Sequence, residues 1–182
     1  QVSENIDMLE RHANRLDTLL LDLLTYSRVG KEPTTQPISL EVIINDTIAR
    51  LDIQSNFNII SDLQCPQIAM SQSNAAELFS ALIGNALKHH EKGQGTLNLS
   101  SHEEEGRCVF SIEDDGPGIP EEYRERAMRV ATTLKPRDVV EGSGMGLAIV
   151  AKIIKHYGGE FAFESPQSLG GVRIRVTLPL EL

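Results

Sequence analysis

The chain has 182 residues, of which 40% are apolar, and a net charge of −9 at pH 7. This length suffices for one domain with a sizeable core and an appendage. The acidic balance argues against nucleic acid as a partner, because no basic stripe offsets it. No apolar run approaches the ~20 residues that span a bilayer, so we expect no membrane contact by this part of the protein.

Two further features concern the compartment and the ends of the chain. Cys65 and Cys108 lack metal-like spacing, so we expect small core residues of a reducing compartment, with a disulfide as the alternative. A cytoplasmic location follows from that expectation. The chain begins with Gln1, which leaves open that it is a fragment of a longer protein with a membrane anchor elsewhere.

Residues 1–30 predict one long helix. Apolar side chains, among them Leu9, Leu16, Leu20 and Leu23, recur at intervals of three and four, as in a helical bundle. So apolar a helix needs a partner, from another segment or a second chain. Residues 31–38 contain two prolines and no periodicity, which predicts a linker before a domain at 39–182.

Within that domain, helices alternate with short strands. Ser39 predicts the cap of a helix, and a second helix is expected over residues 73–90. Strands are expected at 57–63, at 96–101 and 107–113 as a hairpin, and in two runs near the C-terminus. Between the last hairpin and these runs, residues 147–157 predict a further helix. The expected fold is an α/β two-layer sandwich, with helices on a mixed, mostly antiparallel sheet.

Three motifs stand on these elements. Asn85 lies on the second helix, residues 114–120 read DDGPGIP directly after a strand, and residues 142–147 read GSGMGL before a helix. A glycine loop that opens a helix offers bare N–H groups to phosphate. Each motif alone is more often an ordinary surface residue or turn.

Together, in this order, the three motifs resemble the Bergerat-type ATP-binding fold of sensor histidine kinases, gyrase, mismatch-repair ATPases and ninety-kilodalton heat-shock chaperones. Residues 82–88, LIGNALK, resemble the family's asparagine box, and 114–120 and 142–150 resemble its two glycine boxes. Residues 9–28 resemble the second helix of the dimerisation and phosphotransfer hairpin of the histidine kinases. Residues 133–138, TLKPRD, are similar to the lids of phytochrome- and PAS-coupled kinases.

The resemblance implies a role for each motif. Asp114 would accept a hydrogen bond from the adenine amino group, and Asn85 would offer its amide oxygen to Mg²⁺. Lys88 would reach phosphate, and residues 121–141 would form a lid. The implied nucleotide-binding residues are Asn85, Lys88, His89, Asp114, Gly116, Gly118, Ile119, Thr133, Leu134, Lys135, Gly142, Ser143, Gly144, Met145, Gly146 and Leu147, with Asn85 as the metal ligand.

The function implied is that of a histidine kinase. ATP with Mg²⁺ would give its γ-phosphate to a histidine on a hairpin helix outside this chain, for relay to the aspartate of a response regulator receiver domain. The intact protein would be a homodimer through the N-terminal helix. His12 lacks the acidic residue that follows the phosphoacceptor in such kinases, so we expect it to be a surface residue.

Two departures from the family pattern keep alternatives open. Ala81 stands where the hydrolytic relatives carry a glutamate base, which favours a kinase over an ATP-hydrolysing switch. Residues 127–130, AMRV, occupy the place of paired lid phenylalanines. A degenerate kinase that serves as a dimerisation and regulator-docking scaffold is therefore the second alternative.

Overall fold

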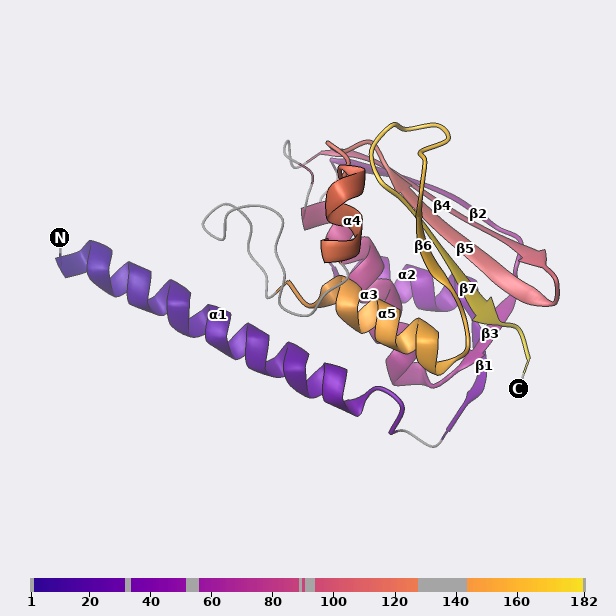
Figure 1. Cartoon of the computed structure of the whole chain (residues 1–182), viewed down its shortest axis with the longest axis horizontal. Helices are drawn as coiled ribbons and strands as arrows, with labels where there is room; N and C mark the ends of the chain where they lie inside the picture. The colour runs from indigo at the N-terminus through magenta and orange to yellow at the C-terminus, as the bar shows by residue number, and fades with distance from the viewer. Residues whose placement is uncertain are drawn as a thin grey trace.

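The computed structural model of the chain describes residues 2–31, 34–51, 56–88, 90, 94–127 and 144–181. Figure 1 shows a layer of helices packed on one face of a sheet, with the first helix extending away from these layers. The predicted two-layer α/β sandwich is confirmed.

Helix α1 (Val2–Arg28) confirms the predicted N-terminal helix. Its C-terminal end contacts α5 (Gly146–His156), where the Nζ atom of Lys152 donates to the carbonyl oxygen of Tyr26 and lies 4.1 Å from the centre of the Tyr26 ring. Along the rest of α1 most of the apolar side chains that the structure describes are exposed, for example Leu9 at 64% and Leu16 at 66%. These side chains form a surface that another helix could cover.

The main sheet has five strands in the spatial order β2-β4-β5-β7-β6. β2 and β4 run parallel, and every other neighbouring pair in this sheet is antiparallel, so the predicted mixed, mostly antiparallel sheet is confirmed. The strands are β2 (Phe57–Leu63), β4 (Gly95–Glu104), β5 (Arg107–Asp114), β6 (Phe161–Glu164) and β7 (Arg173–Pro179).

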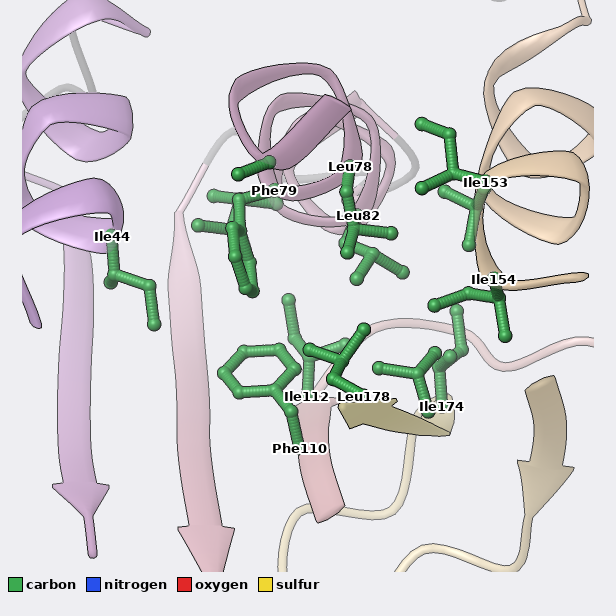
Figure 2. Packing of buried hydrophobic residues seen from close by; sticks show 14 of the residues in the cluster. Ile44, Leu78, Phe79, Leu82, Phe110, Ile112, Ile153, Ile154, Ile174 and Leu178 are labelled. Atoms are coloured by element: carbon green, nitrogen blue, oxygen red, sulfur yellow. The ribbon is translucent and has the colours of Figure 1, made fainter. Parts of the chain in front are cut away.

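Three helices cover one face of this sheet: α2 (Leu40–Arg50), α3 (Gln72–Lys88) and α5. The hydroxyl of Ser39 accepts the N–H of Val42 at 3.4 Å, so the predicted cap of α2 is confirmed. Apolar side chains from the helices and the sheet meet between the two layers (Figure 2). At the centre, Phe79 of α3 and Phe110 of β5 make an edge-to-face contact with ring centres 5.2 Å apart, a geometry that aromatic pairs prefer.

A second, two-stranded sheet corrects part of the prediction. β1 (Gln36–Ser39) pairs antiparallel with β3 (Gln67–Met70), whereas the sequence pattern predicts a linker at residues 36–38 and no strand at 67–70. Ile38 opposes Ile68, and both side chains are buried. Pro37 can occupy β1 because an edge strand leaves some N–H groups unused. The short helix α4 (Glu121–Ala127) follows the first glycine turn, at the beginning of the range expected to form the lid.

Both cysteines are free and buried, which confirms the prediction of reduced core residues. Burial raises the pKa of the Cys108 thiol above its ordinary value, as expected for a group whose charged form is disfavoured in an apolar environment. No helix of the described residues is long and apolar enough to span a bilayer.

A buried carboxylate ties the hairpin of β6 and β7 to β5. The Oε1 atom of Glu113 accepts the N–H groups of Ser168 at 2.7 Å and Leu169 at 2.6 Å, and Oε2 pairs with Arg173 at 3.1 Å. Burial alone would raise the pKa of Glu113, but these backbone donors and Arg173 outweigh burial and lower the pKa to about 2. The carboxylate is therefore stabilised in its charged form.

This low pKa predicts a specific dependence of stability on acid. The folded pKa of about 2 lies below the ordinary value of 4.5, so the contribution is fully present above pH ~5 and is lost as the pH falls through 2. Its size is of the order of 3 kcal/mol. In urea unfolding, the free energy of unfolding of the wild-type chain should fall more steeply between pH 5 and 2 than that of Glu113→Gln. Glu103→Gln, a change at an exposed position, should follow the wild type; equal slopes for wild type and Glu113→Gln would refute the expectation.

Candidate nucleotide-binding site

Helix α3 carries the first predicted motif. Its buried side faces the core, while Asn85 is half-buried and Lys88 is exposed. Ala81 lies one turn before Asn85, so the two residues share a face of the helix. The methyl group of Ala81 lies 4.0 Å from where a Cβ on Gly146 would stand. This face of α3 is therefore turned toward the beginning of α5.

The second motif places a carboxylate at the end of β5. The Asp114 side chain is buried, and its Oδ1 atom accepts the N–H of Gly116 at 2.9 Å and of Val172 at 3.1 Å. Burial raises the pKa of Asp114, against the lowering effect of these two hydrogen bonds. Among the described residues no donor contacts Oδ2, so the arrangement leaves one carboxylate oxygen for a ligand.

Glycines give this carboxylate its space. A Cβ on Gly116 would stand 2.9 Å from Oδ1 of Asp114, and one on Gly171 would stand 2.3 Å from it. Gly118 has φ +78°, a conformation that side chains other than hydrogen rarely allow. The close approach of the backbone to Asp114 therefore requires glycine at 116 and 171.

Asp115, the next residue, connects the glycine turn to the end of α3. Its Oδ1 atom lies 2.6 Å from Nε2 of His90 and accepts the N–H of Thr96 at 2.8 Å. Burial opposes the charge on Asp115, but the hydrogen bonds from Thr96 and His90 outweigh burial and lower its pKa. The His90 ring also makes an edge-to-face contact with Phe57 at 5.4 Å. His90 thus fixes the turn relative to the helix that carries Asn85.

The third motif opens α5. Gly144 has φ +75°, and the helix begins at Gly146 after Met145, whose side chain does not cap it. The first N–H groups of a helix have no partner within the helix, and they attract anions. The side chains of Met145 and Leu147 are buried, so only the backbone of these predicted residues could face a ligand.

The structure thus brings the described parts of the three motifs to one helix. Gly146 approaches α3 at Ala81, and the turn at Asp114 is joined to α3 through Asp115 and His90. Ile119, also predicted, is half-buried in that turn. Six predicted residues lie outside the described residues: His89, Thr133, Leu134, Lys135, Gly142 and Ser143.

Sequence reasoning missed two parts of this site. The loop of residues 165–172 supplies the Val172 N–H to Asp114, and its only signal in the sequence is the pair Gly170-Gly171. His90 gave no signal, because Asp115 is 25 residues away along the chain. Neither contact could be read from local periodicity.

A separate cavity of about 680 Å³ lies beside α2, β1 and the beginning of α3. It is lined by Thr34, Gln36, Ile43, Asp46, Ala49, Arg50, Ser71, Gln72, Ser73 and Ala76. None of these residues belongs to the predicted nucleotide site, so this cavity is distinct from it.

Known proteins resemble the chain over most of its length. It is 29% identical over 170 residues to cyanobacterial phytochrome A of a Nostoc species, covering 91% of this chain and 22% of the relative. It is 30% identical over 183 residues to the adaptive-response sensory kinase SasA of a Nostoc species, covering 92% and 44%. The chain therefore spans less than half the length of these curated relatives.

Solved structures share the fold. The mycobacterial sensor histidine kinase MprB matches with a TM-score of 0.70 and 24% identity, over 80% of this chain and 97% of that chain. Full-length ShkA in complex with AMPPNP matches with a TM-score of 0.74 and 22% identity, over 97% and 38%. The fold is thus that of histidine kinase catalytic domains.

A family model described as histidine kinase-, DNA gyrase B-, and HSP90-like ATPase matches residues 70–182. This range contains Asn85, the turn at Asp114 and the beginning of α5. The chain therefore belongs to the family of histidine kinase-, DNA gyrase B- and HSP90-like ATPases.

Proposed function

We propose that this chain binds ATP as its Mg²⁺ complex and that the intact protein transfers the γ-phosphate to a histidine on a dimerisation hairpin outside the chain. The phosphate then passes to the aspartate of a response regulator receiver domain. The observation that carries the proposal is the Asp114 carboxylate, buried with its Oδ1 atom held by two backbone N–H groups. Family membership supports ATP as the ligand.

Recognition of adenine follows from the hydrogen bonds of Asp114. A carboxylate only accepts hydrogen bonds, and the adenine amino group donates them. Guanine carries a carbonyl oxygen at the equivalent position. That oxygen would face Oδ2, and two acceptors cannot form a hydrogen bond with each other. Because Gly116 and Val172 occupy Oδ1, the free oxygen has a fixed direction. The site is therefore suited to ATP rather than GTP.

The phosphates and Mg²⁺ have candidate partners at the other end of the site. Among the described residues, no group of three His, Cys, Asp or Glu side chains could hold a metal, so the ion would depend on Asn85 and on the phosphates themselves. The residues fit that arrangement, because Mg²⁺ prefers oxygen and is commonly held by few side chains plus substrate phosphates. Lys88 is exposed beyond Asn85 and would contact phosphate as a point charge.

Phosphoryl transfer needs positioning and neutralisation of charge more than a catalytic base. The N-terminus of α5 would supply N–H groups and the positive end of a helix dipole for the phosphates. ShkA, which shares the fold, was solved with AMPPNP, and this supports the assignment of a nucleotide to the site.

The proposed partners concern the rest of the protein. The apolar side chains exposed on α1, such as Leu16 and Leu20, would pack against the other helix of the hairpin and against the same helices of a second copy in a homodimer. The nucleotide site would lie in the cytoplasm, where ATP and receiver domains are found.

One observation bears on the alternative of an ATP-hydrolysing switch. Ala81 faces the beginning of α5, where the hydrolytic relatives that the sequence resembles carry a glutamate. An alanine offers no group to activate water. The scaffold alternative remains the second candidate, motivated by this alanine and by the altered lid sequence. A scaffold would not bind ATP, whereas a kinase and an ATP-hydrolysing switch would both bind it.

Asp114→Asn tests the recognition of adenine. The two backbone donors would retain the amide oxygen, so the amide NH₂ would face the adenine amino group, donor to donor. We expect the dissociation constant for Mg-ATP to rise at least about tenfold, equivalent to ~1.4 kcal/mol, and the preference for ATP over GTP to narrow. Calorimetric titration measures both constants.

The matched control is Asp62→Asn, the same chemical change at an exposed position of β2, which should bind like the wild type. Equal ATP affinity of the wild type and Asp114→Asn would contradict adenine recognition by Asp114. No binding by the wild type would favour the scaffold.

Turnover of Mg-ATP distinguishes a kinase domain from an ATP-hydrolysing switch. With Mg-ATP, the chain should release phosphate no faster than Asp114→Asn and should form no acid-labile phosphohistidine, because it has neither the glutamate base nor the expected acceptor. Steady-state phosphate release and acid-base stability of incorporated label measure these quantities. Release that depends on Asp114 would support the hydrolytic switch, and phosphohistidine in the chain would place the acceptor within it.

A further inference from the structure

Glu113 is the neighbour of Asp114 on β5, and successive side chains of a strand point to opposite faces of the sheet. Asp114 therefore points to the helix side and Glu113 to the other side. Only 1% of the Glu113 side chain is exposed. A carboxylate is seldom buried so completely unless several donors compensate for its lost hydration.

The donors to Glu113 come from the loop of residues 165–172, between β6 and β7, and from the base of that hairpin. In addition to the N–H groups of Ser168 and Leu169, the Ser168 hydroxyl donates to Oε1 at 3.3 Å. The guanidinium of Arg173 contacts Oε2 of Glu113 at 3.1 Å and Oε2 of Glu164 at 3.0 Å. Glu164 pairs with Arg173 where β6 ends and β7 begins. Glu113 thus holds the tip and the base of the hairpin.

The same loop also contacts Asp114. The N–H of Val172 donates to Oδ1 at 3.1 Å, and its carbonyl accepts the N–H of Asp114 at 3.0 Å. The N–H of Gly171 donates to the carbonyl of Asp114 at 3.0 Å. Three hydrogen bonds therefore join Asp114 to the loop that Glu113 anchors from the opposite face of the sheet.

We propose that Glu113 is a positioning residue for adenine recognition: it holds the loop of residues 165–172 where the loop's backbone orients the Asp114 carboxylate. The proposal rests on the proposed function, since it concerns the recognition of adenine at the same site. Glu113 itself touches no nucleotide, because it lies on the face of the sheet away from the helices.

The tight packing around Asp114 makes this coupling direct. A Cβ on Gly171 would stand 2.3 Å from Oδ1 of Asp114 and 2.4 Å from its carbonyl oxygen, so no side chain separates the loop from the carboxylate. If the loop moves away, Oδ1 loses one of its two N–H partners, and the carboxylate can rotate. Both oxygens would then be available in several directions, and selectivity for a donor at the adenine position would fall.

Glu113→Gln tests the proposal. The new amide can still accept from Ser168 and Leu169, but its NH₂ would face the guanidinium of Arg173, donor to donor, and the charge that holds the loop is lost. The matched control is Glu164→Gln, which removes the other carboxylate partner of Arg173 but has no hydrogen bond to residues 165–172 among the described residues. A thermal unfolding midpoint for each variant shows the fraction folded at the assay temperature.

The first measurement is amide hydrogen exchange in the nucleotide-free chain. We expect the N–H groups of Val172 and Gly171 to exchange faster in Glu113→Gln than in the wild type, while Glu164→Gln leaves both unchanged. Unchanged protection of Val172 in Glu113→Gln would overturn the proposal, because the loop would then hold its place without the carboxylate.

The second measurement is titration of folded protein with Mg-ATP and Mg-GTP. Loss of one oriented hydrogen bond corresponds to about a fivefold increase in the dissociation constant for ATP, with GTP less affected, so the ATP/GTP selectivity falls. A merely structural role would lower the unfolding midpoint and leave the selectivity unchanged, which would overturn the proposal. Failure of the wild type to bind either nucleotide would refute the proposed function, and with it the adenine role. Wild-type selectivity in Glu113→Gln would refute only the role of Glu113.

Discussion

The packing of α3 against the sheet is the constraint on which the site depends. Phe79 and its apolar neighbours bury one side of the helix between the two layers, and burial of such side chains is the main source of stability in a domain of this size. The other side approaches Gly146 at Ala81, and the end of the helix approaches Asp115 through His90. Two segments far apart in the sequence are therefore held near Asn85 by contacts with the one helix that this packing fixes on the sheet.

The two buried carboxylates at the end of β5 have different roles, one in the stability of the fold and the other in binding a ligand. Glu113 is saturated with donors and has a lowered pKa, so its charge stabilises the fold. Among the described residues, donors contact only one oxygen of Asp114. Burial raises its pKa, and part of its hydrogen-bonding capacity is left for a ligand. An acceptor oxygen that no protein donor occupies can accept a hydrogen bond from a ligand without breaking a contact of the fold.

Local pattern predicted most of the elements. The alternation in residues 96–101 and 107–113, the helical spacing before Asn85 and the glycines before α5 each depend on neighbours in sequence, which is why they could be predicted. β1 and β3 could not, because each has four residues and its stability comes from pairing with the other. The hydrogen bonds from Val172 to Asp114 and from His90 to Asp115 were equally hidden, since they join residues 58 and 25 positions apart.

The most direct test of a nucleotide site assembled on α3 is a map of backbone amide chemical shifts on addition of a non-hydrolysable Mg-ATP analogue. The account predicts saturable shifts at Asn85, at Gly116 in the first glycine turn and at Gly146, with a Mg-GTP analogue causing smaller changes at Gly116. Shifts confined to the cavity near Ile43 and Arg50 would contradict the account, because the nucleotide would then bind away from all three motifs. Saturable shifts without dependence on the base would contradict adenine recognition at Asp114.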